Sequence, residues 1–506
     1  MTDPDRLSAL DASFLALDTP TAPLHVGWTM RFGGSAPSLA ELRRHVEERL
    51  HLVPRFRKRV VRPALGLGPA YWEDAPGFTI DAHVHAIPAP APGGAAGLRD
   101  VASVLLSFPL APHQPLWRIF LVELGEDDFA LVGQVHHALV DGIAAMEVAL
   151  LLFGPAPPGG APEPWRPFGI SHPLPSPQRA ISGSAHLTLE LARGLKDVRP
   201  GSLRDAAAAL EVLTRRGPST SLQANGTHRR EVATAEAGFD GVRAAGRRHG
   251  ATVNDVLLAA CTLALGGALR RRGEAPAGLK VLIPVNVRGD ASPGALGNRV
   301  SLVTVELPVA ERDPIAALRR VRDRTRAVKA ADATGSLDAL SRAADWLPGP
   351  AQRTLARALA GAADYAAVIS NVPGPPVELG LLGRPLRALF PSVPVPAGCG
   401  LTIGCISYAG RLHVGLTADA EVVPDLRAVA QDLEAAFDVL RVEAPVAPTP
   451  WAARARRRRG GAGAQRAASR EVAPASGNAV STAQAIEREQ SATMRHDRSA
   501  PSRGVT

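Results

Sequence analysis

Cysteine is scarce in this chain, with only Cys261, Cys399 and Cys405 among 506 residues. Three cysteines are too few for a disulfide framework, and none has the paired spacing or the neighbouring histidines of a zinc site. We therefore expect a reducing, cytosolic setting and no bound metal. Cys261, inside a predicted helix, is interpreted as a small core residue and not as a nucleophile.

The sequence also lacks a long apolar run that is free of ionisable residues. Its longest apolar stretch, residues 129–154, contains two His, one Asp and one Glu, which are costly inside a bilayer. The first twenty residues begin acidic and lack the basic and apolar regions of a secretory signal. We expect buried protein core at 129–154, and neither a secretory signal nor a membrane-spanning helix.

Net charge is low outside the last stretch of the chain. Of the formal +9, residues 451–506 contribute +7, with eleven Arg against four Asp or Glu. A nearly neutral body argues against nucleic-acid binding, which usually needs a basic face on the domain itself. The basic run at Arg454 and Arg456–Arg459 is interpreted either as a solvated charge run or as a contact for anionic lipid.

Strand-like and helix-like segments alternate along the chain, which predicts an α/β (α+β) fold. Ser38 and Glu41 form a capping box that opens a helix. Another helix is expected near 252–272. The polar GEDD sequence suits a hairpin turn between two strands. The predicted strands cover 24–32, 118–124, 129–137, 280–288, 299–307, 366–372, 401–410 and 411–419.

Proline marks the predicted domain boundary. Residues 155–177 contain nine prolines, which prevents regular structure and indicates a surface linker. We predict an N-terminal domain over 1–154, a Pro-rich linker and connecting helix over 155–228, and a C-terminal domain over 229–444. Residues 445–506 lack apolar periodicity and are expected to form a disordered basic tail.

The sequence QVHHALVDG (134–142) stands where a predicted strand gives way to a helix. Because neighbouring strand residues point to opposite faces, only one of His136 and His137 can face a given cavity. Divergent side chains argue against a metal site built from His136, His137 and Asp141. A histidine satisfied in the core is the structural alternative. A neutral imidazole can instead accept a hydroxyl proton, which favours general-base acyl transfer.

Two further residues of this stretch have open roles. Asp141 could orient the imidazole as in a catalytic triad, or could turn away and hold the turn through an arginine. Gly142 supplies backbone freedom at the turn. Spacing does not choose between the two interpretations of Asp141.

HHALVDG is similar to the HHxxxDG motif of the superfamily that contains chloramphenicol acetyltransferase, carnitine acyltransferases, plant alcohol acyltransferases and peptide-synthetase condensation domains. Further stretches narrow the resemblance, over about residues 7–440, to the bacterial wax ester synthase/diacylglycerol acyltransferase family. These stretches are LSALDASFLALDTPTAPLHVG (7–27), PLW (115–117), VNDVLLA (253–259), PVNVRGD (284–290), LGN (296–298), ISNVPGP (369–375) and SYAGRLHVGLTAD (407–419).

The resemblance implies two chloramphenicol-acetyltransferase-like domains joined by a crossover linker, with a substrate channel between them. It places the catalytic histidine at His137 and makes Asp141 structural. Arg288 occupies the place of the arginine that pairs with this aspartate in related enzymes. Acyl-CoA would enter from one side and a hydroxyl acceptor from the other, with no acyl-enzyme intermediate and no cofactor besides the co-substrate acyl-CoA.

Four other motif residues have competing interpretations. Trp117, preceded by Pro115 and Leu116, is interpreted as part of the acyl-chain channel or as core. Asn254 and Asn371 are candidates for organising the oxyanion site, and a helix cap is the alternative for Asn254. Asp255, beside Asn254, belongs to the same family stretch.

The expected activity is transfer of a long-chain acyl group from acyl-CoA to diacylglycerol, to a long-chain fatty alcohol, or to both. Two alternatives stay open: a condensation-type enzyme that takes its acyl group from a carrier protein, and a lipid-inclusion-binding protein without catalysis. Because the substrates are insoluble in water, we expect a cytoplasmic protein in peripheral contact with the inner face of the plasma membrane or with lipid inclusions. No nucleic-acid partner is expected.

Overall fold

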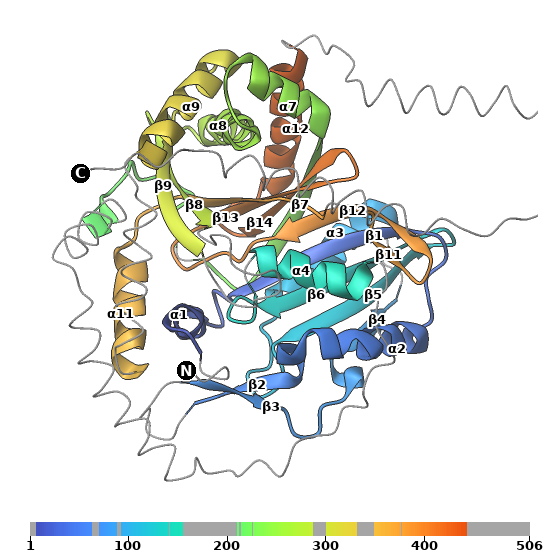
Figure 1. The fold of residues 1–506 in the computed structure, drawn as a ribbon. Helices are drawn as coiled ribbons and strands as arrows, with labels where there is room; N and C mark the ends of the chain where they lie inside the picture. Colours follow the sequence, from blue (N-terminus) through green and yellow to red (C-terminus); the bar gives the residue numbers. More distant parts are fainter. Residues whose placement is uncertain are drawn as a thin grey trace, which may run out of the picture. The chain divides into compact units, whose positions relative to one another are not determined.

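The computed structural model describes residues 7–62, 70–88, 93–140, 142–154, 210–211, 214–224, 226–286, 300–330, 349–375 and 377–442. The α-helices are α1 (Ala9–Leu17), α2 (Leu39–Arg49), α3 (Gly94–Ser107), α4 (Gly142–Phe153), α7 (Phe239–Arg248), α8 (Val253–Arg271), α9 (Pro314–Ala330), α11 (Gly349–Ala362) and α12 (Leu426–Val442). Short 3-10 helices cover Leu50–Leu52, Pro54–Arg57 and Ile80–Ala82. The strands form two large sheets and one small sheet (Figure 1).

The first large sheet has the order β11-β12-β1-β6-β5-β4, with every pair antiparallel except β4 and β5. Alternate residues of β5 face opposite layers: Ile119 packs with α2 and α4, whereas Phe120 packs with α3. The strands are β1 (His25–Gly33), β4 (Val84–Ile87), β5 (Trp117–Gly125), β6 (Asp128–His136), β11 (Gly380–Leu381) and β12 (Arg384–Ser392). A separate hairpin pairs β2 (Lys58–Val61) with β3 (Tyr71–Asp74).

The second large sheet has the order β7-β14-β13-β10-β8-β9, with parallel pairs on both sides of β10. Helices α7, α8, α9 and α12 lie along it (Figure 1), and α8 and α12 share its largest hydrophobic core. The strands are β7 (Arg230–Gly238), β8 (Leu279–Asn286), β9 (Val300–Leu307), β10 (Ala367–Val372), β13 (Leu401–Tyr408) and β14 (Arg411–Asp419).

Most of the elements predicted from the sequence are present. The Ser38–Glu41 capping box opens α2 with both of its hydrogen bonds, and all eight predicted strands appear with boundaries shifted by no more than two residues. Strands β2, β3, β4, β7, β11 and β12, in contrast, were not predicted. The Pro-rich segment at 155–177 and the tail at 445–506 lie outside the described residues.

A strand from the second half of the chain completes the first sheet. β12 falls inside the range predicted for the C-terminal domain, yet it pairs with β1 from Gly27 opposite Ser392 to Phe32 opposite Leu386. β12 also contacts β13 and β14. The two sheets therefore share one continuous seam.

Two glycines allow β12 to approach the second sheet closely. A Cβ atom on Gly415 would overlap with the carbonyl oxygen of Pro391 in β12, and one on Gly404 would lie 3.0 Å from the Pro391 ring. Backbone atoms cannot move aside as a flexible side chain can. Gly415 is therefore required for the observed spacing of the two halves.

The apolar segments that approach membrane-spanning length are core elements. Within residues 129–154, β6 (to His136) and α4 (Gly142–Phe153) are the regular elements, and most of their described residues are buried, as expected. Helix α8 is long and apolar enough to cross a membrane by length and composition, but 72% of its 18-residue apolar window is buried inside the protein. Most of its side chains are buried because α8 lies between the second sheet and the neighbouring helices.

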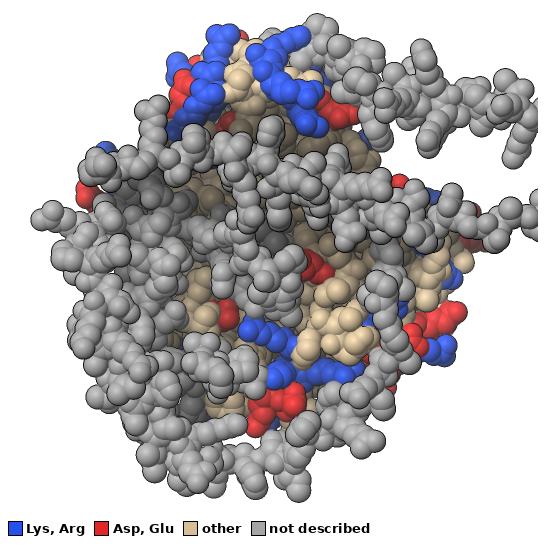
Figure 2. All heavy atoms as spheres, viewed as in Figure 1, with Lys and Arg blue, Asp and Glu red and all other residues tan. Residues whose placement is uncertain are grey.

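Basic side chains gather on one surface although the body of the chain is nearly neutral. Figure 2 shows Lys and Arg concentrated over α7 and α9. Some of them are paired, as Arg320 is with Glu311 and Arg322 with Asp323. The basic residues of the two helices are Arg243, Arg247, Arg248, Arg319, Arg320, Arg322, Arg324, Arg326 and Lys329. The net charge of the body therefore did not reveal the basic surface over these two helices.

Replacing Gly415 by Ala should destabilise the protein, because the new methyl group meets the backbone of Pro391 at the seam. We expect a loss of about 1–3 kcal/mol in the free energy of unfolding, the usual cost of overpacking. Urea titration would measure it. Gly125→Ala is the matched control, since a Cβ there meets nothing within 4 Å. Equal stability of the two variants would contradict the close approach.

Candidate functional site

The turn after β6 sends its two histidines in different directions. His136, the last residue of β6, is 3% exposed and lies inside the protein. His137 follows in the turn and lines a large cavity. Backbone hydrogen bonds of 2.9 Å hold both residues, from the His136 N–H to Leu116 and from the His137 N–H to Leu24. His137 is therefore the histidine available to a ligand.

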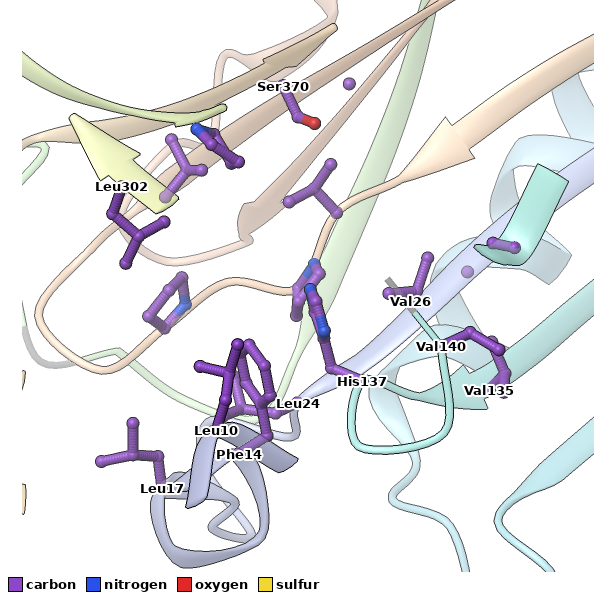
Figure 3. A pocket seen from close by; sticks show the side chains of 18 of the residues that line it. Leu10, Phe14, Leu17, Leu24, Val26, Val135, His137, Val140, Leu302 and Ser370 are labelled. Carbon is purple, nitrogen blue, oxygen red and sulfur yellow. The ribbon is translucent and has the colours of Figure 1, made fainter. Parts of the chain in front are cut away.

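The cavity beside His137 has a volume of about 770 Å³ and lies between the two halves of the chain. This volume falls within the range of about 300–1,000 Å³ that encloses small-molecule ligands. Figure 3 shows His137, Val135 and Val140 on one side and Leu302 and Ser370 across from them. The wall is mainly apolar and includes Leu10, Phe14, Leu17, Trp28, Met146, Phe153, Leu355, Leu359 and Val368.

Helix α1 reaches both histidines of the motif. The Phe14 ring stacks on the His137 imidazole with a centroid separation of 4.0 Å and an interplanar angle of 17°. One turn later, the Asp18 carboxylate lies 3.7 Å from Nε2 of His136. Sequence reasoning did not identify Phe14 or Asp18, although their four-residue spacing on a helix was a signal that they share one face.

The His136 ring is held by the backbone of Ala138 in the turn and by Asp18. Its Nδ1 accepts a 3.0 Å hydrogen bond from the Ala138 N–H, which leaves Nε2 facing Asp18. Burial raises the pKa of Asp18, but the nearby His136 and the 2.9 Å hydrogen bond from the Leu24 N–H outweigh it, so that the pKa lies below its usual value. The carboxylate is thus ionised at neutral pH and anchors the motif from behind.

A neutral histidine lies beneath the motif, opposite His136 on the neighbouring strand. Burial lowers the pKa of His25 to about 4, against a smaller opposing effect of its 2.9 Å bond to the Leu106 carbonyl. Gln134 contacts the same ring at 3.2 Å. His25 and Gln134 therefore add hydrogen bonds beneath the motif but no charge.

Trp117 lies in the core and not in the cavity wall. It is 1% exposed, donates a 2.7 Å hydrogen bond from Nε1 to the Phe56 carbonyl, and stacks on His83. Phe56 stands between Trp117 and the cavity and lines it. Pro115 and Leu116 are buried beside Trp117. This placement favours the core interpretation of the PLW stretch over direct contact with a substrate chain.

The two candidate asparagines do not line the cavity. Asn254 is half-buried in the first turn of α8, whose cap is the side chain of Thr252, so the capping role considered for Asn254 is wrong. Asp255 completes that capping box and accepts a 2.6 Å hydrogen bond from Thr325.

On β10 it is Ser370, and not Asn371, that lines the cavity. Val368 and Val372 share its face, as the alternation of strand side chains requires. The hydroxyl of Ser370 is visible at the cavity in Figure 3. Applying the period-two rule to ISNV would have selected this serine from the sequence.

The structure describes some of the remaining residues that the sequence singled out. Gly142 begins α4, and Asp141 and Arg288 lie outside the described residues. Cys261 is fully buried in the second core, where burial raises the pKa of its thiol and keeps it unreactive. Within the described part of the chain, no three His, Cys, Asp or Glu side chains gather where they could hold a metal ion.

Comparison with known proteins identifies the relatives of this fold. The model of the wax ester synthase/diacylglycerol acyltransferase catalytic domain matches residues 7–257, and that of the corresponding C-terminal domain matches residues 296–441. Two Mycobacterium tuberculosis proteins, both named as diacylglycerol O-acyltransferases, are 29% and 28% identical. The first alignment covers 86% of this chain and 90% of the relative, and the second 85% and 94%.

Solved structures show the same two-domain fold, as predicted. The wax ester synthase/diacylglycerol acyltransferase from Marinobacter aquaeolei VT8 matches with a TM-score of 0.63 at 23% identity, over 87% of this chain and all of that one. The first condensation domain of the calcium-dependent antibiotic synthetase matches with a TM-score of 0.57 at 17% identity, over 87% and 97% of the two chains. Both family models and the fold agree: this chain belongs to the wax ester synthase/diacylglycerol acyltransferase family of acyltransferases.

Proposed function

We propose that this acyltransferase moves a long-chain acyl group from acyl-CoA to the hydroxyl of diacylglycerol or of a long-chain fatty alcohol, with His137 as general base. The observation that carries the proposal is the position of His137 on the wall of a large apolar cavity. A mainly apolar cavity with few polar groups suits a substrate with a long chain and a single reacting end.

The proposed reaction needs a base and no covalent enzyme intermediate. His137 takes the hydroxyl proton as the oxygen attacks the thioester carbonyl, and the tetrahedral intermediate then expels the CoA thiolate, which receives that proton. A C–O bond forms and a C–S bond breaks, so acyl-CoA is consumed as co-substrate and no resident cofactor is required. The Ser370 hydroxyl, on the same cavity, is the candidate donor for the oxyanion.

Diacylglycerol is one proposed acceptor because two relatives are named for that activity. A fatty alcohol is the second, because the family name includes wax ester synthases. The two acceptors differ in width, so the shape of the cavity beside α1 and α11 would decide between them.

The main alternative is a condensation-type enzyme supplied by a carrier protein. Its support is the structural match to a condensation domain, at 17% identity, which concerns the fold alone. The mainly apolar wall of the cavity favours a lipid acceptor. A lipid-binding protein without catalysis is the second alternative, and the His137 variant below distinguishes it.

Purified protein given palmitoyl-CoA should release free CoA when hexadecanol or dioleoylglycerol is added, with the matching wax ester or triacylglycerol seen by lipid chromatography. His137→Ala should lower this rate by about 10²–10⁴-fold, the usual contribution of a general base. The matched control is His113→Ala, because His113 is exposed on a loop. Release that is equal in the His137 variant would reject the base, and no release with either acceptor would favour the alternatives.

We also propose peripheral contact with the inner face of the plasma membrane or with lipid inclusions. Its support is the basic composition of residues 451–506 and the basic surface over α7 and α9. Anionic headgroups attract such clusters by about 1 kcal/mol for each Lys or Arg near the membrane.

Deleting residues 451–506 should weaken binding to phosphatidylserine-containing liposomes at least tenfold while sparing turnover of detergent-dispersed acceptor. Flotation with liposomes at low and high salt would measure the change, and vesicles of neutral lipid serve as the control. Binding that is unchanged by the deletion would show that the tail is a solvated charge run and leave α7 and α9 as the contact.

A further inference from the structure

Helix α1 and its C-cap residue contact both histidines of the motif: Asp18 lies beside His136, and Phe14 stacks on His137. The Phe14 phenyl group lies face to face with the His137 imidazole at 4.0 Å, and Figure 3 shows both residues at the same wall of the cavity. We propose that Phe14 is a positioning residue for the reaction: its ring fixes the imidazole plane and stabilises the protonated imidazole. This inference rests on the proposed role of His137 as general base.

Few ionisable side chains are found among the described residues that line the cavity. Among the described residues that line it there is no Asp or Glu, and the ionisable groups besides His137 are Arg357, Tyr365 and Cys405. Burial raises the pKa of Tyr365 and of Cys405, so both are neutral. Asp18 lies against His136, on the far side of the motif.

An aromatic face can stabilise a positive charge that forms beside it. The face of a phenyl ring carries the negative part of its quadrupole, and a cation within about 6 Å of the centroid is attracted to it, most strongly where water is excluded. His137 gains its charge only after it has taken the hydroxyl proton. The Phe14 face therefore acts more strongly on the protonated state than on the neutral ground state, which is the condition for raising a rate.

The ring of Phe14 is held in place before any substrate arrives. Ser8 caps the start of α1 by accepting a hydrogen bond from the Asp11 N–H at 3.0 Å. On α11, Arg357 donates from Nε to the Ala16 carbonyl at 3.2 Å. Asp18 then ties the end of α1 to β1 through the Leu24 N–H. With both ends of the helix fixed, the stacked geometry requires no reorganisation during the reaction.

The test is a set of variants at Phe14 whose pH–rate profiles are compared. Phe14→Leu keeps an apolar side chain but removes the ring face. We expect kcat to fall about 5- to 30-fold, and the acid limb of kcat/KM to move about one unit lower in pH, because the imidazole then protonates less readily. Phe14→Tyr keeps the ring and should restore most of the rate and the original limb.

Two further changes separate charge stabilisation from simple packing. Incorporating 3,4,5-trifluorophenylalanine at position 14 keeps the shape of the ring but removes the negative face, so it should behave like Phe14→Leu. Leu10→Ala removes an apolar side chain one turn earlier on the same cavity wall. It should change the KM for the acceptor and leave the acid limb in place. Thermal melts check that each variant is folded.

A readout without turnover keeps the test independent of the proposed function. In protein labelled with ¹³C-histidine, the resonance that is missing from His137→Ala identifies this ring, and its titration midpoint can be followed in each variant. A lower midpoint with Leu and with the fluorinated ring, but not with Tyr or Leu10→Ala, supports the proposal. Equal midpoints in all of them overturn it, whereas an active His137→Ala variant overturns the general base instead.

Discussion

The architecture depends on the pairing of β12 with β1. This antiparallel ladder brings a segment from the last quarter of the chain into the first sheet and fixes the distance between the two halves. Gly404 and Gly415 permit the contact because neither carries a Cβ where Pro391 approaches. The cavity is lined by residues of both sheets, and α1 and α11, which contact each other, form another part of its wall.

The described carboxylates of the site lie away from its apolar space. The fixed carboxylate of Asp18 and the neutral His25 lie behind the motif, and the described residues that line the cavity include no Asp or Glu and one permanent charge, Arg357. Burial strengthens every electrostatic interaction of a group that becomes charged there. An enzyme that must bind a hydrocarbon chain and also move a proton gains from this separation. An apolar substrate cannot replace the water around a permanent charge, so binding the chain costs less where few such charges line the cavity.

The period of strand side chains was enough to predict much of this arrangement. It gave eight strands, and it indicated that only one of two adjacent histidines could face the cavity. It did not give β12, because RPLRALFPS carries two prolines and two arginines and has no clear alternation. Phe14 and Asp18 were missed for a different reason: the two histidines that they contact lie more than one hundred residues away, and a single sequence does not contain those distances. Ser370 was within reach of the period-two rule, which was not applied to β10. The net charge of the chain also did not predict the basic surface over α7 and α9, because a sum does not show where charges gather.

The long separation between β1 and β12 has a consequence for how the protein is made. Translation adds about 5–20 residues per second, so roughly 20–70 s pass between the synthesis of β1 and that of the strand that covers its edge. During this time β1 offers an open row of backbone donors and acceptors next to apolar side chains, which is a template for pairing with other chains. Nascent chains of this enzyme are therefore exposed to aggregation on the ribosome, and codon choice or chaperone supply during that interval should govern the yield of soluble protein.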